Sequence, residues 1–146
     1  MQRSVCRLVG GLVLAVCVAG CGDSPTSPGG GLQGSVPQTL LKGGLPSMEV
    51  LTLFAAGTFT TPASGRVEVT VDWTSPTNNI DVYVTKGTCT VDQVNDRTCN
   101  FAILSESTTA RPEKLSATLD AATYSLMIGN RGPTTETASY EVTFTR

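Results

Sequence analysis

The chain has 146 residues, of which 40% are hydrophobic, 15% are charged and 5% are aromatic. This length suits one domain with additional segments rather than two full domains. The absence of histidine excludes Ser-His-Asp and Cys-His catalysis and metal or haem sites with histidine ligands. A net charge of −2 leaves no basic surface excess for nucleic acid, so we expect no nucleic-acid partner.

The N-terminal 20 residues have the three parts of a secretory signal peptide. Arg3 and Arg7 give a positive start, residues 8–19 are apolar, and small residues follow. A helix of this apolar length spans about 18 Å, which is too short for a bilayer core of about 30 Å. The pattern predicts a signal peptide over residues 1–20 rather than a membrane-spanning helix.

The sequence Val18, Ala19, Gly20, Cys21 resembles the lipobox of bacterial lipoproteins, in which small residues precede an invariant cysteine. The resemblance implies that the Cys21 sulfur receives a diacylglyceryl group, that cleavage occurs before Cys21, and that the new amine is acylated. Several acyl chains on one residue would hold the protein to membrane lipid, whereas one chain binds only marginally. Gly22 replaces the aspartate that retains enterobacterial lipoproteins in the inner membrane, so the resemblance implies the outer membrane. The alternative is an ordinary secreted protein with a chance cysteine here.

Residues 21–35 are expected to be the lipidated cysteine and a flexible tether. Gly, Pro and Ser dominate this stretch, which cannot bury enough apolar surface to offset its ordering entropy. We therefore assign residues 36–146 to one folded domain, with order beginning between Val36 and Met48.

That domain shows a period-two alternation of apolar and polar residues, which is typical of strands with one buried face. Val67, Val69, Val71 and Trp73 carry the clearest example, and no convincing amphipathic helix is found. Short strands separated by Gly, Pro, Asn and Ser turns predict an all-β, antiparallel, jelly-roll-like sandwich of seven or eight strands. The expected strands cover residues 49–54, 57–61, 67–73, 80–85, 100–105, 115–119, 124–128 and 138–145.

Cys89 and Cys99 are the cysteines that remain after signal removal and lipidation. An even pair in an exported protein predicts a disulfide, with two free thiols or a soft metal site as the alternative. The pair would close part of the long loop 87–100, which contains Asp92, Asp96 and Arg97. This loop is either a partner-binding edge or a hairpin loop stapled for stability.

The segment 67–84 resembles the bacterial pre-peptidase C-terminal domain. Val69, Val71 and Trp73 match one strand of that family, and Asp81, Val82 and Tyr83 match the next. Residues 119–124 are similar to its Leu-x-Ala-Gly-Thr-Tyr turn, with Ala122 where glycine is usual, and Tyr140, Val142 and Phe144 match its closing strand. The resemblance implies a non-catalytic β-sandwich module of exported proteins, some of which bind polymers or calcium.

Two candidate sites follow from these residues. Asp72, Asn78, Asn79 and Asp81 lie around one strand connection and offer the oxygen ligands that calcium requires, although such residues also form turns or solvated sheet faces. Trp73 and Tyr83 are candidate sugar-stacking rings, with core packing as the alternative for Trp73.

No nucleophile elbow, phosphate loop or metal-ligand spacing is found, so an enzyme is not expected. We expect a non-catalytic envelope lipoprotein that displays a binding or structural module to an envelope protein or polysaccharide. The alternative is a calcium-dependent carbohydrate- or polymer-binding module.

Overall fold

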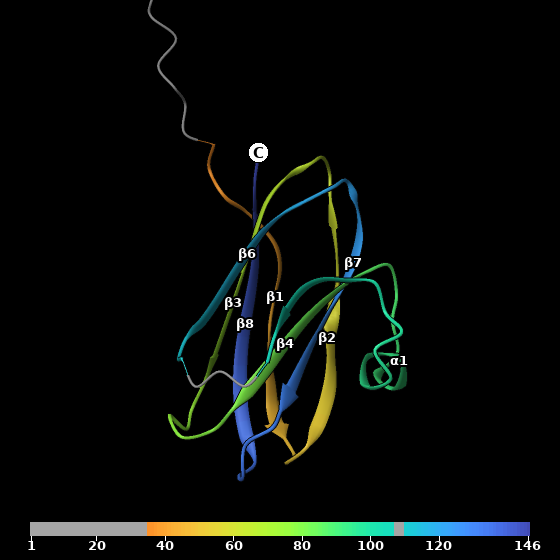
Figure 1. Cartoon of the computed structure of the whole chain (residues 1–146). Coiled ribbons are helices and arrows are strands. Elements are labelled where there is room, and N and C mark those ends of the chain that lie inside the picture. Colours follow the sequence, from red (N-terminus) through yellow and green to blue (C-terminus); the bar gives the residue numbers. More distant parts are fainter. Residues whose placement is uncertain (1–34, 107–109) are drawn as a thin grey trace, which may run out of the picture. The chain divides into compact units, whose positions relative to one another are not determined.

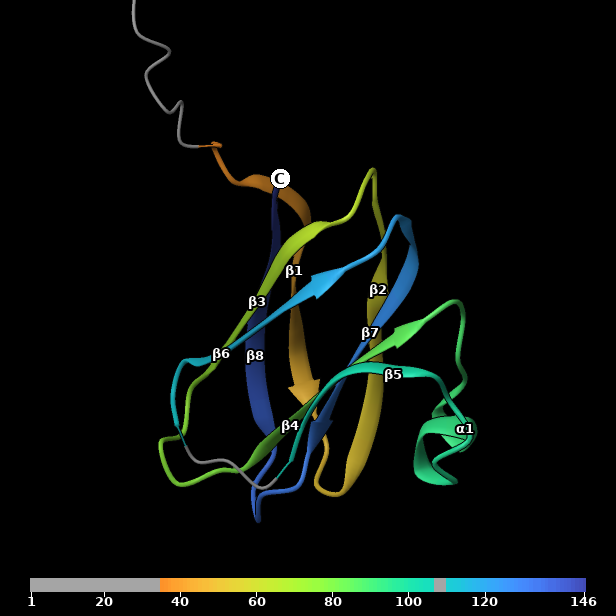
Figure 2. The same cartoon turned by 45° about the horizontal axis from the view of Figure 1, so that its top comes forward.

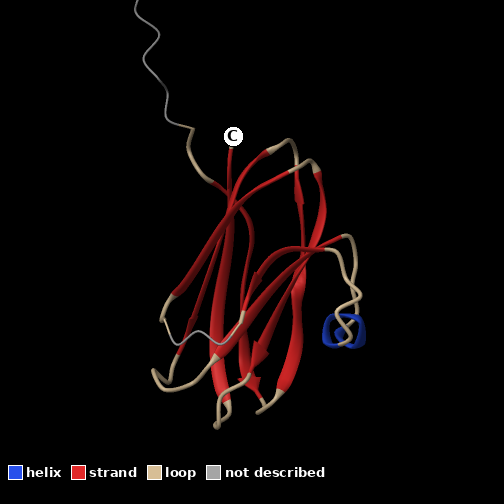
Figure 3. Ribbon diagram, viewed as in Figure 1, coloured by secondary structure: helices blue, strands red, loops and turns tan. Residues whose placement is uncertain are grey.

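The computed structural model describes residues 35–106 and 110–146. The predicted signal peptide, Cys21 and nearly all of the predicted tether lie outside the described residues. Within the described part the chain forms eight strands and one short helix (Figures 1 and 3). The elements are β1 (Gln38–Met48), β2 (Thr52–Thr61), β3 (Gly65–Trp73), β4 (Ile80–Lys86), α1 (Val91–Asn95), β5 (Phe101–Ser105), β6 (Glu113–Leu119), β7 (Ala122–Asn130) and β8 (Glu136–Thr145).

The strands form two four-stranded antiparallel sheets with the orders β1-β8-β3-β6 and β2-β7-β4-β5. The pairs β1 with β8, β2 with β7, β3 with β6 and β4 with β5 are those of one long hairpin. Rolling that hairpin adds the pairs β3 with β8 and β4 with β7, which gives the jelly-roll order. Figure 2 shows the two sheets from a second direction. The predicted all-β antiparallel sandwich is confirmed.

The core lies between the two sheets and is built by the alternating residues. Val67, Val69, Val71 and Trp73 of β3 are all at most 2% exposed, because every second side chain of a strand points to the same face. Each fully buried aliphatic side chain of this kind contributes about 1.5–3 kcal/mol. The opposing sheet supplies the other half of the core through Ile80, Val82, Val84, Leu126 and Ile128.

The N-terminal strands differ from the prediction. Residues 49–54 and 57–61 were expected as two strands, but β2 is one strand that begins at Thr52, and a turn precedes it. A β-bulge between Ala55 and Gly57 absorbs one extra residue against β7, so the apolar pattern shifts phase without a break in the strand. Leu51 in the preceding turn has a left-handed backbone with φ of 59°.

The sequence analysis also missed α1. Thr90 caps this helix through a capping box, in which its side chain accepts from the Gln93 N–H and the Gln93 side chain accepts from the Thr90 N–H. The Thr-x-x-Gln spacing is the local signal that would have located it.

The helix and its flanking loop cover the outer face of the sheet β2-β7-β4-β5. Val94 of α1 packs with Leu53, Tyr83 and Met127 in a second, smaller apolar cluster. The central strands β4 and β7 are therefore buried on both faces. Asp81, Tyr83 and Thr85 alternate with the core residues of β4, which is typical of a strand with one solvated face, but all three are at most 4% exposed, and Tyr83 packs against Val94 of α1.

Candidate functional site

A hollow of about 610 Å³ lies at one end of the sheet β1-β8-β3-β6. Three neighbouring strands and the segment before β6 line it, through residues 44–46, 72–74 and 137–139 and Arg111. Strand β1 begins at Gln38, which pairs with Phe144. Residues 44–46, towards the other end of β1, line the hollow. The hollow therefore lies away from the end at which the chain enters the sandwich. Its volume is within the usual range of small-molecule sites.

An ion pair between Asp72 and Arg111 lies on the rim of the hollow. The Arg111 Nε donates to Asp72 Oδ1 at 2.9 Å, and its Nη1 donates to the Thr74 carbonyl at 2.8 Å. The Trp73 backbone N–H also donates to Asp72 Oδ1, at 3.0 Å. Asp72 Oδ2 and Arg111 Nη2 make no hydrogen bond within the described residues. One carboxylate acceptor and one guanidinium donor of this ion pair therefore have no hydrogen-bond partner in the described residues.

Trp73 is one of the residues that line the hollow. Its side chain is 2% exposed and belongs to the main core, so the core interpretation is confirmed. Its indole nitrogen is buried and has no hydrogen-bond partner in residues 35–106 and 110–146. Sugar stacking requires an exposed ring face, and Tyr83 and Tyr124 are also only 2% exposed. The expectation that Trp73 and Tyr83 form an aromatic sugar platform is therefore wrong.

The four predicted calcium ligands are divided among separate interactions. Asp72 pairs with Arg111, whereas Asp81 accepts from the Tyr83 hydroxyl at 2.9 Å and from Arg131 at 3.3 Å.

The two asparagines of the predicted calcium site also differ in their hydrogen bonds. The Asn78 amide donates to the Thr134 carbonyl and to Glu136, both at 3.0 Å, and Asn79 Oδ1 is buried without a hydrogen bond in the described part. No group of three or more Cys, Asp and Glu side chains able to hold a metal is present in the described part of the chain. The sequence could not reveal this, because Arg111 and Arg131 come from distant segments.

Glu136 is the centre of a polar network that the sequence analysis missed. This side chain is 2% exposed, yet it accepts from the backbone N–H groups of Thr74, Ser75 and Thr137 at 2.9, 3.0 and 2.8 Å. The Thr74 hydroxyl and the Asn78 amide also donate to it. Burial alone would raise the pKa of Glu136, but these five donors outweigh burial and lower the pKa to about 2. The network fixes the β3–β4 loop, one border of the hollow, to the start of β8.

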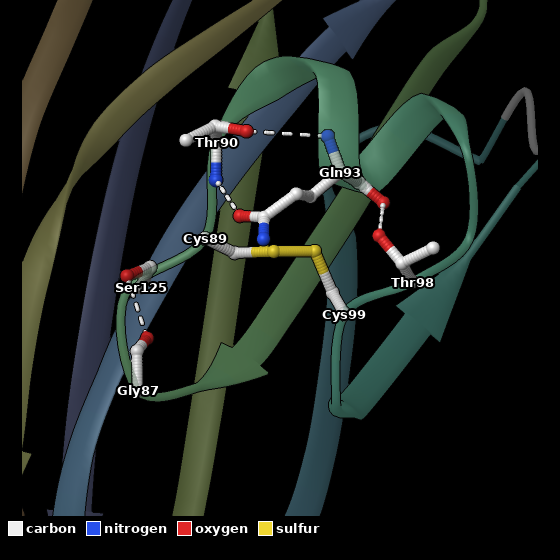
Figure 4. Close-up of a disulfide and its surroundings, with 7 residues drawn as sticks. All are labelled: Gly87, Cys89, Thr90, Gln93, Thr98, Cys99 and Ser125. Carbon is white, nitrogen blue, oxygen red and sulfur yellow. Dashed lines mark hydrogen bonds between the residues drawn. A yellow bond between two sulfur atoms is a disulfide. The ribbon is translucent and has the colours of Figure 1, made fainter.

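The disulfide between Cys89 and Cys99 is present as predicted and closes ten residues of the loop that carries α1 (Figure 4). The Ser125 hydroxyl of β7 donates to the Gly87 carbonyl at 2.9 Å, and the Thr98 hydroxyl donates to the Gln93 carbonyl at 3.3 Å. These contacts hold the loop as a cover on the sheet.

A second charged network joins this cover to the sheet. Arg97, one of the loop charges noted in the sequence, forms an ion pair with Glu106 and lies over the Phe101 ring at 5.8 Å. The Tyr83 hydroxyl lies 3.0 Å from Glu106 Oε1 as well as bonding to Asp81. Burial is the main cause that raises the pKa of Tyr83, and the Arg97 hydrogen bond is the main cause that lowers the pKa of Glu106.

Comparison with known proteins assigns no family to the chain. No family model matches the chain and no curated protein matches it, so the resemblance to the pre-peptidase C-terminal domain stays a prediction. A solved structure with a similar arrangement is the C-terminal domain of A223, a structural protein from Sulfolobus turreted icosahedral virus. It is 14% identical with a TM-score of 0.41, and the match covers 76% of this chain and 99% of that chain.

No helix in residues 35–106 and 110–146 is long and apolar enough to cross a bilayer.

Proposed function

We propose that this chain is an exported, lipid-anchored protein of the bacterial cell envelope whose jelly-roll domain is a non-catalytic binding module. The observation that carries the proposal is the ordered N-terminal series of a charged start, a short apolar run, the lipobox ending at Cys21 and a Gly-, Pro- and Ser-rich stretch. A thioether-linked diacylglyceryl group at Cys21 would give the membrane affinity that a single acyl chain cannot. Gly22 favours the outer membrane.

The disulfide supports export. Structural disulfides persist in the oxidising space outside the cytoplasm and are rare inside it. Cys89 and Cys99 close the loop that lies over Tyr83 and Met127, so the bond would stabilise this packed state in an oxidising compartment.

The placement of the hollow supports a binding role. The described chain begins next to β1, and residues 44–46 border the hollow towards the other end of that strand. A domain held through its N-terminal segment would leave the hollow accessible from the side away from the attachment. Asp72 and Asp81 are each held by an arginine, so neither is poised as a proton-transfer group, which supports a non-catalytic role.

Replacement of the Cys21 thiol tests the anchoring. We expect the unaltered chain to sediment with membranes and to incorporate a labelled fatty acid, whereas the Cys21→Ser chain should stay in the soluble exported fraction. Cys17→Ser is the matched control, because this cysteine lies in the apolar run that cleavage removes, and it should behave like the unaltered chain. A Cys21→Ser chain that still sediments with membranes and carries label would overturn the proposal.

A further inference from the structure

We propose that the hollow at the end of the sheet β1-β8-β3-β6 binds an uncharged sugar unit of an envelope polysaccharide, with two neighbouring hydroxyl groups held by Asp72 and Arg111. The inference rests on the proposed function, since it names the ligand class of that binding module.

The chemistry of the rim favours hydroxyl groups. Asp72 Oδ2 can only accept and Arg111 Nη2 can only donate a hydrogen bond, while their other atoms are fixed by the ion pair and by Thr74. Adjacent sugar hydroxyls match this arrangement, because one can donate to the carboxylate while the next accepts from the guanidinium. Hydrogen bonds to charged groups are stronger than bonds between neutral groups.

The lining of the hollow also contains apolar side chains. Leu45, Pro46 and Ala138 border the same space and offer apolar surface to the C–H face of a sugar ring.

The charge of the lining selects an uncharged ligand. Asp72 and Arg111 cancel each other, and every other residue that lines the hollow is uncharged. A strongly acidic polymer would be repelled by Asp72, and a strongly basic polymer would be repelled by Arg111.

Side chains dominate recognition at the centre of this lining. β8 is an internal strand whose Ala138 and Ser139 pair with both β1 and β3, so recognition there depends on side chains.

The single tryptophan of the sequence gives a direct reporter, because Trp73 contributes to the hollow. The test uses the full Cys21→Ser chain purified without detergent and follows tryptophan emission during titration with neutral oligosaccharides of cellulose, starch, xylan and chitin. Oligogalacturonate and a pool of extended peptides serve as the acidic and peptide probes. We expect a saturable change with at least one neutral oligosaccharide at up to millimolar concentration.

Three variants localise the binding. Asp72→Asn and Arg111→Gln should each weaken it about tenfold or more, as expected for a hydrogen bond to a charged group. Arg66→Gln is the control, because Arg66 also pairs with a carboxylate on β3, Glu68, but lies at the opposite end of the strand. Thermal unfolding confirms that each variant is folded.

The ligand assignment is overturned if no neutral oligosaccharide alters the emission, if only the acidic or peptide probes do, or if Asp72→Asn and Arg111→Gln bind as tightly as the unaltered domain. These outcomes are separate from those of membrane fractionation. A chain that is anchored through Cys21 but binds no sugar contradicts this inference alone, and a sugar-binding chain that is never lipidated contradicts the anchoring alone.

Discussion

Replacement of Glu136 by glutamine is the most informative perturbation of the domain. The substitution keeps the size of the side chain but removes its charge and turns one acceptor oxygen into an amide donor. That amide would face a site in which Thr74, Ser75, Thr137 and Asn78 all donate. At least one of these buried donors would lose its partner.

The expected loss follows from the pKa of Glu136. Its hydrogen bonds hold the pKa at about 2 in the folded protein, against an ordinary value of 4.5. At about 1.4 kcal/mol for each pKa unit, the ionised carboxylate contributes about 3 kcal/mol to folding at neutral pH. Because the folded pKa is the lower one, this stability is fully present above pH 4.5 and is lost as the pH falls towards 2.

Urea unfolding, followed by circular dichroism at several pH values, measures the effect. At pH 7 the Glu136→Gln protein should be less stable than the unaltered protein by about 3 kcal/mol, with an unchanged dependence on urea concentration. The difference should shrink as the pH falls from 4.5 to 2. Glu141→Gln is the control, because Glu141 lies on the same strand, is much more exposed and makes only surface contacts, a 3.7 Å ion pair with Lys42 and a 3.1 Å hydrogen bond from the Thr39 hydroxyl.

Two results would refute this reasoning. One is a Glu136→Gln protein within about 0.5 kcal/mol of the unaltered protein at pH 7, which is the range of ordinary surface substitutions. The other is a difference that is the same at pH 7 and pH 2, because that would assign the loss to packing rather than to the ionised carboxylate.

Three further predictions concern other parts of the domain. Replacing both Cys89 and Cys99 by alanine should lower the stability by about 3 kcal/mol, the chain-entropy value for a loop of this length, and an unchanged unfolding midpoint in urea would contradict a stabilising role for the disulfide. Calcium at millimolar concentration should leave the thermal midpoint unchanged, because arginines hold Asp72 and Asp81, whereas a rise with calcium concentration would restore the predicted calcium site. Gly43→Ala should destabilise the domain by about 1–3 kcal/mol in thermal unfolding, since a Cβ there would lie 2.5 Å from the Tyr140 hydroxyl, and a neutral effect would show that this ring can move freely.

The sequence alone determined the type of sandwich and the strands with the clearest alternation. Val67, Val69, Val71 and Trp73 alternate so regularly that a one-residue slip would place all four in water, and the same reasoning holds for Tyr140, Val142 and Phe144. The disulfide was also predictable, because elimination left one even pair of cysteines. Both inferences need only local spacing or counting.

The sequence was less informative where strands depend on their partners. β1 contains two glycines and a proline and has little alternation, and it is a strand because β8 pairs with it from Gln38 to Met48. The Ala55–Gly57 bulge changes the phase of β2, which made one strand read as two.

The tertiary structure alone decided the polar chemistry. Asp81 and Tyr83 alternate like residues of a solvated sheet face, but both are buried; Tyr83 packs with Val94 of the loop closed through Cys99, and Asp81 pairs with Arg131. Arg111 lies 39 residues from Asp72, and Glu136 lies 62 residues from Thr74, so no local pattern could pair them. Local spacing determines which face a side chain occupies, whereas the folding of the sheets determines what lies opposite that face.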